Sequence, residues 1–170
     1  MVSREIKLEI QDPKDSATPR EVMMSLLKIA HVPPATIEPG ATVLDAVNVM
    51  AREKVGAVAV MEKAGKSNLL GIFTERDVML RMMQQERNPR ETQVRDVMTS
   101  PVETASEKTT ASEALTLMLE RHLRHLPIVG DDGQLLGMLS IRDLLEDKVE
   151  DLKRELDSLD QYLLNDGPGG

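Results

Sequence analysis

Two seven-residue segments of the chain repeat the same combination of glycine, hydroxyl, arginine and carboxylate side chains. They run from Gly71 to Asp77 (GIFTERD) and from Gly137 to Asp143 (GMLSIRD). In each segment the glycine lies in an apolar run typical of a strand, and the hydroxyl stands where a helix is expected to begin. A helix N-terminus carries free N–H groups and a partial positive charge, so this position suits a phosphate group.

Each polar side chain of these segments has its own chemical use. The hydroxyl can donate a hydrogen bond to a phosphate, and the arginine can donate a charge-assisted one. The carboxylate offers two acceptor oxygens to a cis-diol, such as the hydroxyl pair of a ribose. The glycine leaves room for a flat ligand close to the backbone. The candidate residues are Thr74, Arg76 and Asp77 in the first segment and Ser140, Arg142 and Asp143 in the second.

The same segments also have a purely structural interpretation. T-x-x-D and S-x-x-D are capping boxes, and a capped helix needs no ligand. Capping explains neither the glycine three residues before the hydroxyl nor the arginine before the aspartate. Because both segments carry these two additional residues, the pair of segments favours a ligand site over capping alone.

The two segments belong to a longer internal repeat. Residues Thr36–Met61 align with Thr104–Val129, and Leu69–Leu80 align with Leu135–Glu146. The copies differ in length only between these matched parts, where the tip of a hairpin tolerates insertions. The alignment therefore indicates a duplicated structural unit.

Each copy predicts the same order of elements. A capping box (Thr42 with Asp45, Thr110 with Glu113) opens an amphipathic helix, and two β-rich runs separated by a turn follow. A second helix then begins at Thr74 or Ser140. The fold class is α/β (α+β), with two β-α-β-β-α repeats. One such unit cannot cover both faces of its sheet, so the copies should pack together as a pseudo-twofold pair.

A long helix is predicted after the second repeat, with apolar residues at alternating intervals of four and three. This spacing is a heptad seam, which packs either on the chain's own domain or, as we favour, against another subunit. The seam consists of Leu145, Val149, Leu152, Leu156, Leu159 and Leu163. The expected divisions are 1–32 (tail and short helix), 33–93 (repeat 1), 94–147 (repeat 2) and 148–170 (C-terminal helix and tail).

Composition excludes several classes of site and partner. The net charge of −8 argues against nucleic acid, and the absence of cysteine excludes disulfides and thiolate chemistry. No apolar run approaches the roughly 20 residues that span a bilayer, and the charged N-terminus differs from a signal peptide. We therefore expect no membrane partner and a cytoplasmic location. His122 and His125 are three residues apart, but without further ligands nearby no metal site is expected.

Several of these motifs together resemble one known family. The doubled G-h-h-[ST]-x-x-D signature, the HLPI run at His125–Ile128 and the RDVMT run at Arg95–Thr99 resemble a pair of CBS domains, named after cystathionine β-synthase. The resemblance covers about residues 33–147. It implies a pseudo-twofold pair with two clefts between the repeats, a homodimer of such pairs, and binding of adenosine derivatives.

The resemblance also assigns residues to the ligand. Asp77 and Asp143 would bind ribose hydroxyls, and the hydroxyl and arginine side chains of both signatures would face phosphate. The first copy departs from the family pattern at Val58 and Ala59, so two sites of unequal affinity are expected. Adenine would lie near Thr36, Ile37, Ala57 and Val58 in one cleft and near Thr104, Ala105, His125, Leu126 and Pro127 in the other.

The leading functional hypothesis is a non-catalytic regulatory module that binds an adenine nucleotide, with AMP ahead of ATP and ADP. S-adenosylmethionine and NAD are alternatives that the two arginines disfavour mildly. A rival hypothesis is a structural dimerisation module whose clefts hold no ligand. A nucleotide-hydrolysing enzyme is disfavoured, because neither a general base nor a metal cluster stands out. Any regulatory output would pass to an unidentified protein effector.

Overall fold

The computed structural model describes residues 26–62, 68–106 and 108–165, with side chains up to Tyr162. The predicted tail, most of the predicted short helix at residues 19–29, and the seam side chain of Leu163 lie outside the described residues. Within that short helix, the described residues 26–29 are helical.

The two repeats contain the same elements in the same order. The first repeat comprises β1 (Thr36–Ile37), α2 (Val43–Glu53), β2 (Ala57–Met61), β3 (Leu69–Thr74), α3 (Glu75–Asp77) and the π-helix η1 (Val78–Met83). The second comprises β4 (Ala105–Ser106), α4 (Ala111–Glu120), β5 (His125–Val129), β6 (Leu135–Ser140) and α5 (Ile141–Asn165). A single 3-10 turn, η2 (Val94–Asp96), lies between them.

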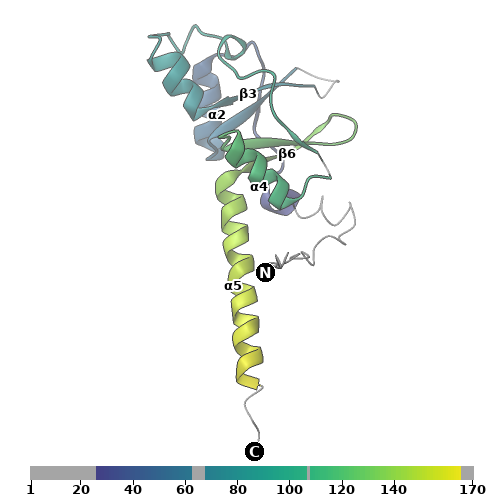
Figure 1. Cartoon of the computed structure of the whole chain (residues 1–170). Coiled ribbons are helices and arrows are strands. Elements are labelled where there is room, and N and C mark those ends of the chain that lie inside the picture. Colours follow the sequence, from purple (N-terminus) through teal and green to yellow (C-terminus); the bar gives the residue numbers. More distant parts are fainter. Residues whose placement is uncertain (1–25, 63–67, 107, 166–170) are drawn as a thin grey trace, which may run out of the picture.

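Each repeat forms a three-stranded sheet of identical topology. β1 runs parallel to β2, and β2 pairs antiparallel with β3. β4, β5 and β6 are arranged in the same way. The registers also agree, since Val58 faces Phe73 in one sheet and Leu126 faces Leu139 in the other. The predicted fold of two β-α-β-β-α repeats with a long C-terminal helix is confirmed, and this long helix is the continuation of α5, the last helix of the second repeat (Figure 1).

The predicted capping boxes open α2 and α4. The Thr42 hydroxyl accepts a hydrogen bond from the Asp45 amide at 3.2 Å, and the Asp45 carboxylate accepts one from the Thr42 amide at 3.0 Å. Thr110 and Glu113 form the equivalent pair at 3.1 and 2.8 Å. Hydrogen bonds from the Thr42 hydroxyl and amide lower the pKa of Asp45, and hydrogen bonds from the Thr110 amide and hydroxyl lower that of Glu113, because they stabilise the charged form. The two helices therefore begin where the sequence indicates.

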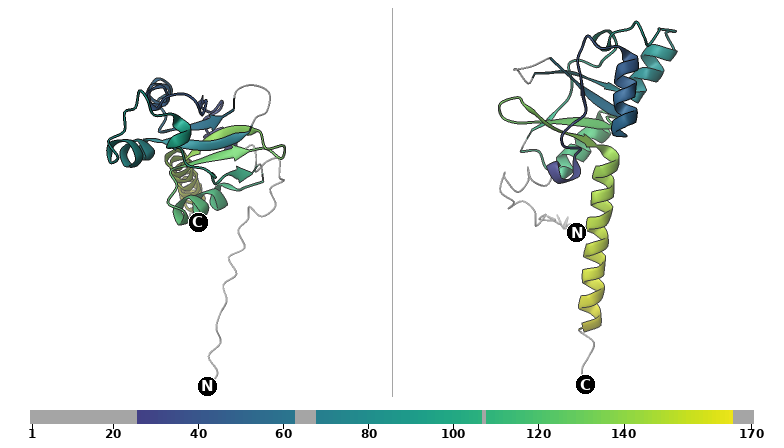
Figure 2. Two further views of the ribbon diagram at one scale, coloured as in Figure 1. Left: turned by 90° about the horizontal axis from the view of Figure 1, so that it is seen from above. Right: turned by 180° about the vertical axis from the view of Figure 1, so that it is seen from behind.

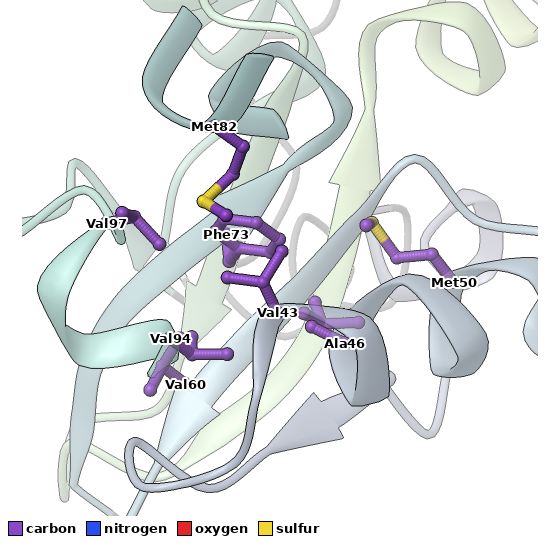
Figure 3. Close-up of a cluster of buried hydrophobic side chains, with 9 residues drawn as sticks. Val43, Ala46, Met50, Val60, Phe73, Met82, Val94 and Val97 are labelled. Atoms are coloured by element: carbon purple, nitrogen blue, oxygen red, sulfur yellow. The ribbon is translucent and has the colours of Figure 1, made fainter. Parts of the chain in front are cut away.

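Each repeat has its own apolar core beneath its helix. Phe73 is the sole phenylalanine of the chain and is fully buried in the first core, beside Val43 and Met82 (Figure 3). The second core is built around Met118, Leu126 and Leu139 in the same way. With almost no aromatic residues, both cores fill their space with aliphatic and methionine side chains, which adapt well to irregular gaps.

A third buried cluster joins the two repeats. Ala57, Ala59 and Ile72 from the first sheet pack with Leu135 and Met138 from the second. The two sheets are therefore held together by apolar contacts between strands, as the duplication predicts for units that cannot cover both of their sheet faces.

The segments that precede each repeat cross over to the other repeat. Thr99 pairs with Ile72 of the first sheet through two backbone hydrogen bonds of 2.8 and 3.0 Å. His31 pairs with Met138 of the second sheet in the same manner, at 2.9 and 3.1 Å. Val94 and Val97 are buried in the first core, whereas Leu26 is buried in the second. Thus the segment that precedes the second repeat completes the sheet and core of the first repeat, and the segment that precedes the first repeat completes those of the second.

These crossing segments explain the signature glycines. A Cβ atom on Gly71 would lie 2.7 Å from the Thr99 carbonyl oxygen and 2.8 Å from the Met98 sulfur. A Cβ atom on Gly137 would lie 3.1 Å from a methyl group of Val32. The sequence interpretation gave this space to a flat ligand; in the structure it is taken by the protein's own backbone and side chains.

The C-terminal helix α5 leaves the body of the molecule after its first turns (Figures 1 and 2). Leu144 is fully buried, but Leu145, Val149 and Leu152 are 44%, 49% and 58% exposed. From Leu145 onward, the described side chains of the heptad seam are therefore not buried against the chain's own domain. None of the described helices is long and apolar enough to cross a membrane.

We expect Gly71→Ala to destabilise the protein by about 1–3 kcal/mol, because the added methyl group would overlap the backbone of the crossing segment. Gly40→Ala is the matched control, since a Cβ atom there meets nothing within 4 Å. Urea unfolding of both variants measures the difference. Equal stabilities of the two variants would contradict the close contact at Gly71.

Candidate functional site

A cleft of about 760 Å³ lies between the two repeats. The second signature lines it from one side with Ser140, Arg142 and Asp143, and the segment 54–57 of the first repeat lines it from the other. Its volume lies within the roughly 300–1,000 Å³ that small-molecule sites occupy. The structure therefore brings one predicted ligand motif to the wall of a cleft of suitable size.

Asp143 is free of protein partners in this cleft. Its side chain is half-buried, and its carboxylate accepts no hydrogen bond from any of the described residues. The neighbouring Ser140 hydroxyl accepts a hydrogen bond from the Arg142 amide at 3.2 Å, so the predicted capping box does not form here. Both oxygens of Asp143 are available to a ligand.

Three cationic side chains line the cleft. Arg142 is exposed at the rim, where its guanidinium donates a hydrogen bond to Glu146 at 2.9 Å. This hydrogen bond raises the pKa of Arg142, which remains charged. Lys54 and Arg124 are the other two cations, and the sequence interpretation missed both of them. Lys54 aligns with His122 in the internal repeat, and each lies in the turn between a helix and the strand that opens the hairpin. Each of the two lines one of the clefts.

A smaller cleft of about 290 Å³ contains the first signature. Thr74, Arg76 and Asp77 line it together with the segment 122–125 of the second repeat. The two clefts are thus pseudo-symmetric, because each combines one signature with the strand that begins the hairpin of the other repeat. Arg76 is exposed, like its equivalent in the larger cleft.

The carboxylate of Asp77 is already occupied within the protein. One oxygen accepts hydrogen bonds from the Thr74 amide at 2.9 Å and the Thr74 hydroxyl at 2.8 Å. The other lies 3.4 Å from the Thr99 hydroxyl and 3.4 Å from the Arg81 guanidinium. Asp77 is 7% exposed. In the first repeat the capping interpretation of the motif is therefore realised, whereas the ribose contact of Asp77 stays a prediction.

Arg81 also ties the crossing segment to the first repeat. Its guanidinium donates to the Val97 carbonyl at 2.7 Å and to the Thr99 hydroxyl at 3.1 Å. Arg81 lines the smaller cleft itself. The Arg81 side chain thus lies beside Asp77, whereas the equivalent position in the second repeat, residue 147, carries no arginine.

His125 lies between the two clefts and lines both. Its ring would be 3.0 and 3.2 Å from a Cβ atom on Gly56, so a larger residue there would require the ring to shift. Burial lowers the pKa of His125, while the nearby carboxylates of Glu75 and Asp143 oppose that shift. The imidazole is consequently neutral near pH 7 and presents a flat, uncharged face.

The remaining predicted contacts lie in or beside the strands at the two clefts. Ala57 and His125 line the larger cleft, and Val58, Leu126 and Pro127 are fully buried in strand interiors. Four further residues were predicted to contact adenine: Thr36 and Ile37 at β1, and Thr104 and Ala105 at the start of β4. None of these four is among the described residues that line the two clefts. Their predicted contact with adenine stays a prediction.

No group of three or more histidine and acidic side chains suitable for a metal ion occurs in the part of the chain that the structure describes. His122 is exposed, and its backbone has a φ of 54°. It lines the smaller cleft beside Leu123.

The chain matches the CBS domain family over residues 20–84 and 94–150. The mitochondrial CBS domain-containing protein CBSX3 of Arabidopsis thaliana is 36% identical over 124 residues, which cover 72% of this chain. The chain spans 60% of the length of CBSX3 and 62% of a 33% identical protein from Methanopyrus kandleri.

Solved structures share the fold. The crystal structure of the CBS domain NE2398 has a TM-score of 0.67 and 34% identity, and the match covers 75% of this chain and 96% of that one. The CBS domain protein PAE2072 of Pyrobaculum aerophilum, complexed with AMP, has a TM-score of 0.63 over 69% of this chain and 88% of its own. PAE2072 is 24% identical to this chain, and at this level the similarity shows only that the two proteins share a fold. With two matched segments in tandem, the chain belongs to the CBS domain family.

Proposed function

We propose that this chain is a non-catalytic regulatory module that binds an adenine nucleotide, AMP ahead of ATP and ADP, in the larger cleft. One observation carries the proposal: inside a cleft of about 760 Å³, the carboxylate of Asp143 has no hydrogen-bond or ion-pair partner among the described residues. A half-buried carboxylate of this kind is satisfied by water in the free protein, and a ligand with hydroxyl donors can replace that water. AMP in the related PAE2072 supports this ligand class.

The cleft offers a suitable group to each part of a nucleotide. The Asp143 carboxylate would accept hydrogen bonds from both ribose hydroxyls. Lys54, Arg124 and the Ser140 hydroxyl would stabilise the phosphate, and Arg142 would join them by exchanging Glu146 for the ligand. Adenine would lie against the backbone at segment 56–57 and the neutral ring of His125.

The smaller cleft is a weaker second site in this proposal. A ligand there would have to displace Arg81 and Thr99 from Asp77, and it would thereby break the contacts that hold the crossing segment. The affinities of the two sites should differ because this rearrangement opposes binding in the first repeat alone. S-adenosylmethionine and NAD remain alternatives for the larger cleft, and phosphate recognition by three cations disfavours S-adenosylmethionine.

The module is proposed to act as a homodimer on an unidentified protein effector. Nucleotide binding between the repeats would change their relative packing, and this change would be passed on by the outer helices. The rival hypothesis, a structural module with ligand-free clefts, gives the same fold but no dependence of stability on nucleotide concentration.

AMP should raise the free energy of unfolding, by about 2.7 kcal/mol at a hundredfold excess over its Kd. Asp143→Ala should abolish this increase without destabilising the free protein, because the carboxylate has no protein partner. Asp77→Ala is the matched control: it should destabilise the free protein by about 1–2 kcal/mol through the lost cap and keep most of the increase. Thermal melts with and without AMP measure both effects. If Asp77→Ala abolished the AMP-dependent increase in stability and Asp143→Ala did not, the assignment of the nucleotide to the larger cleft would be wrong.

Stability should fall as the pH decreases through the ordinary histidine pKa of about 6.5. Burial lowers the folded-state pKa of His125, so the unfolded chain takes up this proton first. The stabilising contribution of the neutral ring is complete above the unfolded pKa and is lost as the pH falls toward the folded pKa. Urea unfolding at about pH 7.5 and about pH 5.5 should show a smaller difference for His125→Gln than for the wild type. An equal difference in both proteins would show that burial does not lower the pKa of His125 in the fold.

A further inference from the structure

The distal part of α5 is a helix without a partner in the described chain. Every described side chain from Leu152 to Tyr162 is exposed, and the helix stands clear of the body when the molecule is seen from the side (Figure 1 and the right view of Figure 2). Isolated helices shorter than about 12–15 residues are marginal in water. A free segment of this kind gains most from packing its apolar face against another helix.

The apolar face is a heptad seam with the spacing of a coiled coil. Val149 and Leu156 occupy a positions, and Leu145, Leu152 and Leu159 occupy d positions. Their exposed fractions lie between 44% and 63%, so the described part of the seam is accessible. Valine at a with leucine at d is typical of two-stranded coiled coils. The seam therefore fits one further helix.

The charges beside the seam exclude one orientation for a second copy of this helix. Lys148 and Glu155 occupy g positions, and Lys153 and Asp160 occupy e positions. In a parallel pair, each g residue faces the e residue of the partner's next heptad, and such contacts set orientation. Lys148 would face the partner's Lys153, and Glu155 would face the partner's Asp160. All of these contacts repel.

Reversing one helix turns the same charges into attractive pairs. In an antiparallel pair, g residues face g residues and e residues face e residues. With the seams in full overlap, Lys148 lies beside the partner's Glu155, and Lys153 lies beside the partner's Asp160. Twofold symmetry makes each contact occur twice. We propose that α5 pairs with α5 of a second copy of this chain as an antiparallel two-stranded coiled coil.

The overlap fixes which seam residues meet. Leu152 packs against the partner's Leu156, and Val149 packs against the partner's Leu159, so that a positions meet d positions throughout. In the antiparallel pair the two bodies lie at opposite ends of the shared helical segment. This pairing uses none of the cleft residues and is independent of nucleotide binding.

Disulfide trapping decides the orientation, because the full chain contains no cysteine. Val149→Cys and Leu159→Cys are made as separate variants and incubated in a glutathione buffer, alone and mixed. We expect a disulfide-linked dimer in the mixture and none in either variant alone, because a disulfide needs Cα atoms within about 7 Å. Linked dimers of each single variant would show a parallel pair and overturn the proposal. The absence of a linked dimer in all samples would overturn it as well.

Charge exchange provides the matched control for the electrostatic argument. Lys148→Glu in both trapping variants should lower the yield of the mixed disulfide, since it then repels the partner's Glu155. Lys148→Glu combined with Glu155→Lys should restore the yield. In a parallel pair, Lys148→Glu would instead remove a repulsion with the partner's Lys153 and raise the yield of the disulfides formed by single variants. An unchanged yield in all charge variants would show that these pairs do not set the orientation.

Discussion

Apolar contact between the two sheets is the interaction on which the rest of the molecule depends. Ala57, Ala59 and Ile72 on one side meet Leu135 and Met138 on the other, and no polar group of the signatures takes part. Small alanines in β2 let the strands approach closely, and the larger side chains of the second sheet fill the remaining space. The clefts border this contact directly, because Ala57 and Met138 of the cluster also line the larger cleft and Ile72 lines the smaller one. Both candidate sites are therefore consequences of how the repeats bury their apolar faces.

Duplication produced two similar clefts, and a few substitutions then made them chemically different. Asp77 is satisfied by Thr74, Thr99 and Arg81, whereas the position of Arg81 is taken in the second repeat by an acidic residue, Asp147. A carboxylate at that position cannot neutralise Asp143, which is left for a ligand. One copy of the motif thus stabilises the fold through its carboxylate, whereas the carboxylate of the other copy has no hydrogen-bond partner among the described residues. The difference follows from a reversal of charge one helical turn after the shared aspartate.

The sequence was sufficient to predict the repeat, the order of elements and both caps, because each of these depends on residues close together in the chain. Thr42 with Asp45 and the glycine-hydroxyl-aspartate signature are local patterns of this kind. The exchange of segments between repeats has no local pattern: nothing near Thr99 indicates that it pairs with Ile72. For the same reason the purpose of Gly71 was misassigned, and the cations that reach a cleft from the opposite repeat were missed. The exposure of the seam likewise depends on the point at which α5 departs from the body of the molecule. The heptad spacing of the sequence does not determine that point.

The exchange of segments has a consequence for how the molecule comes apart. Residues 94–99 complete the first sheet and core, and residues 26–32 complete the second. Neither repeat keeps its full set of contacts if the other melts, so partial unfolding of a single repeat exposes apolar surface in both. The pair should behave as one cooperative folding unit. Cutting the chain between the repeats would not yield two halves that fold independently, because each half would contain a segment that belongs to the core of the other half.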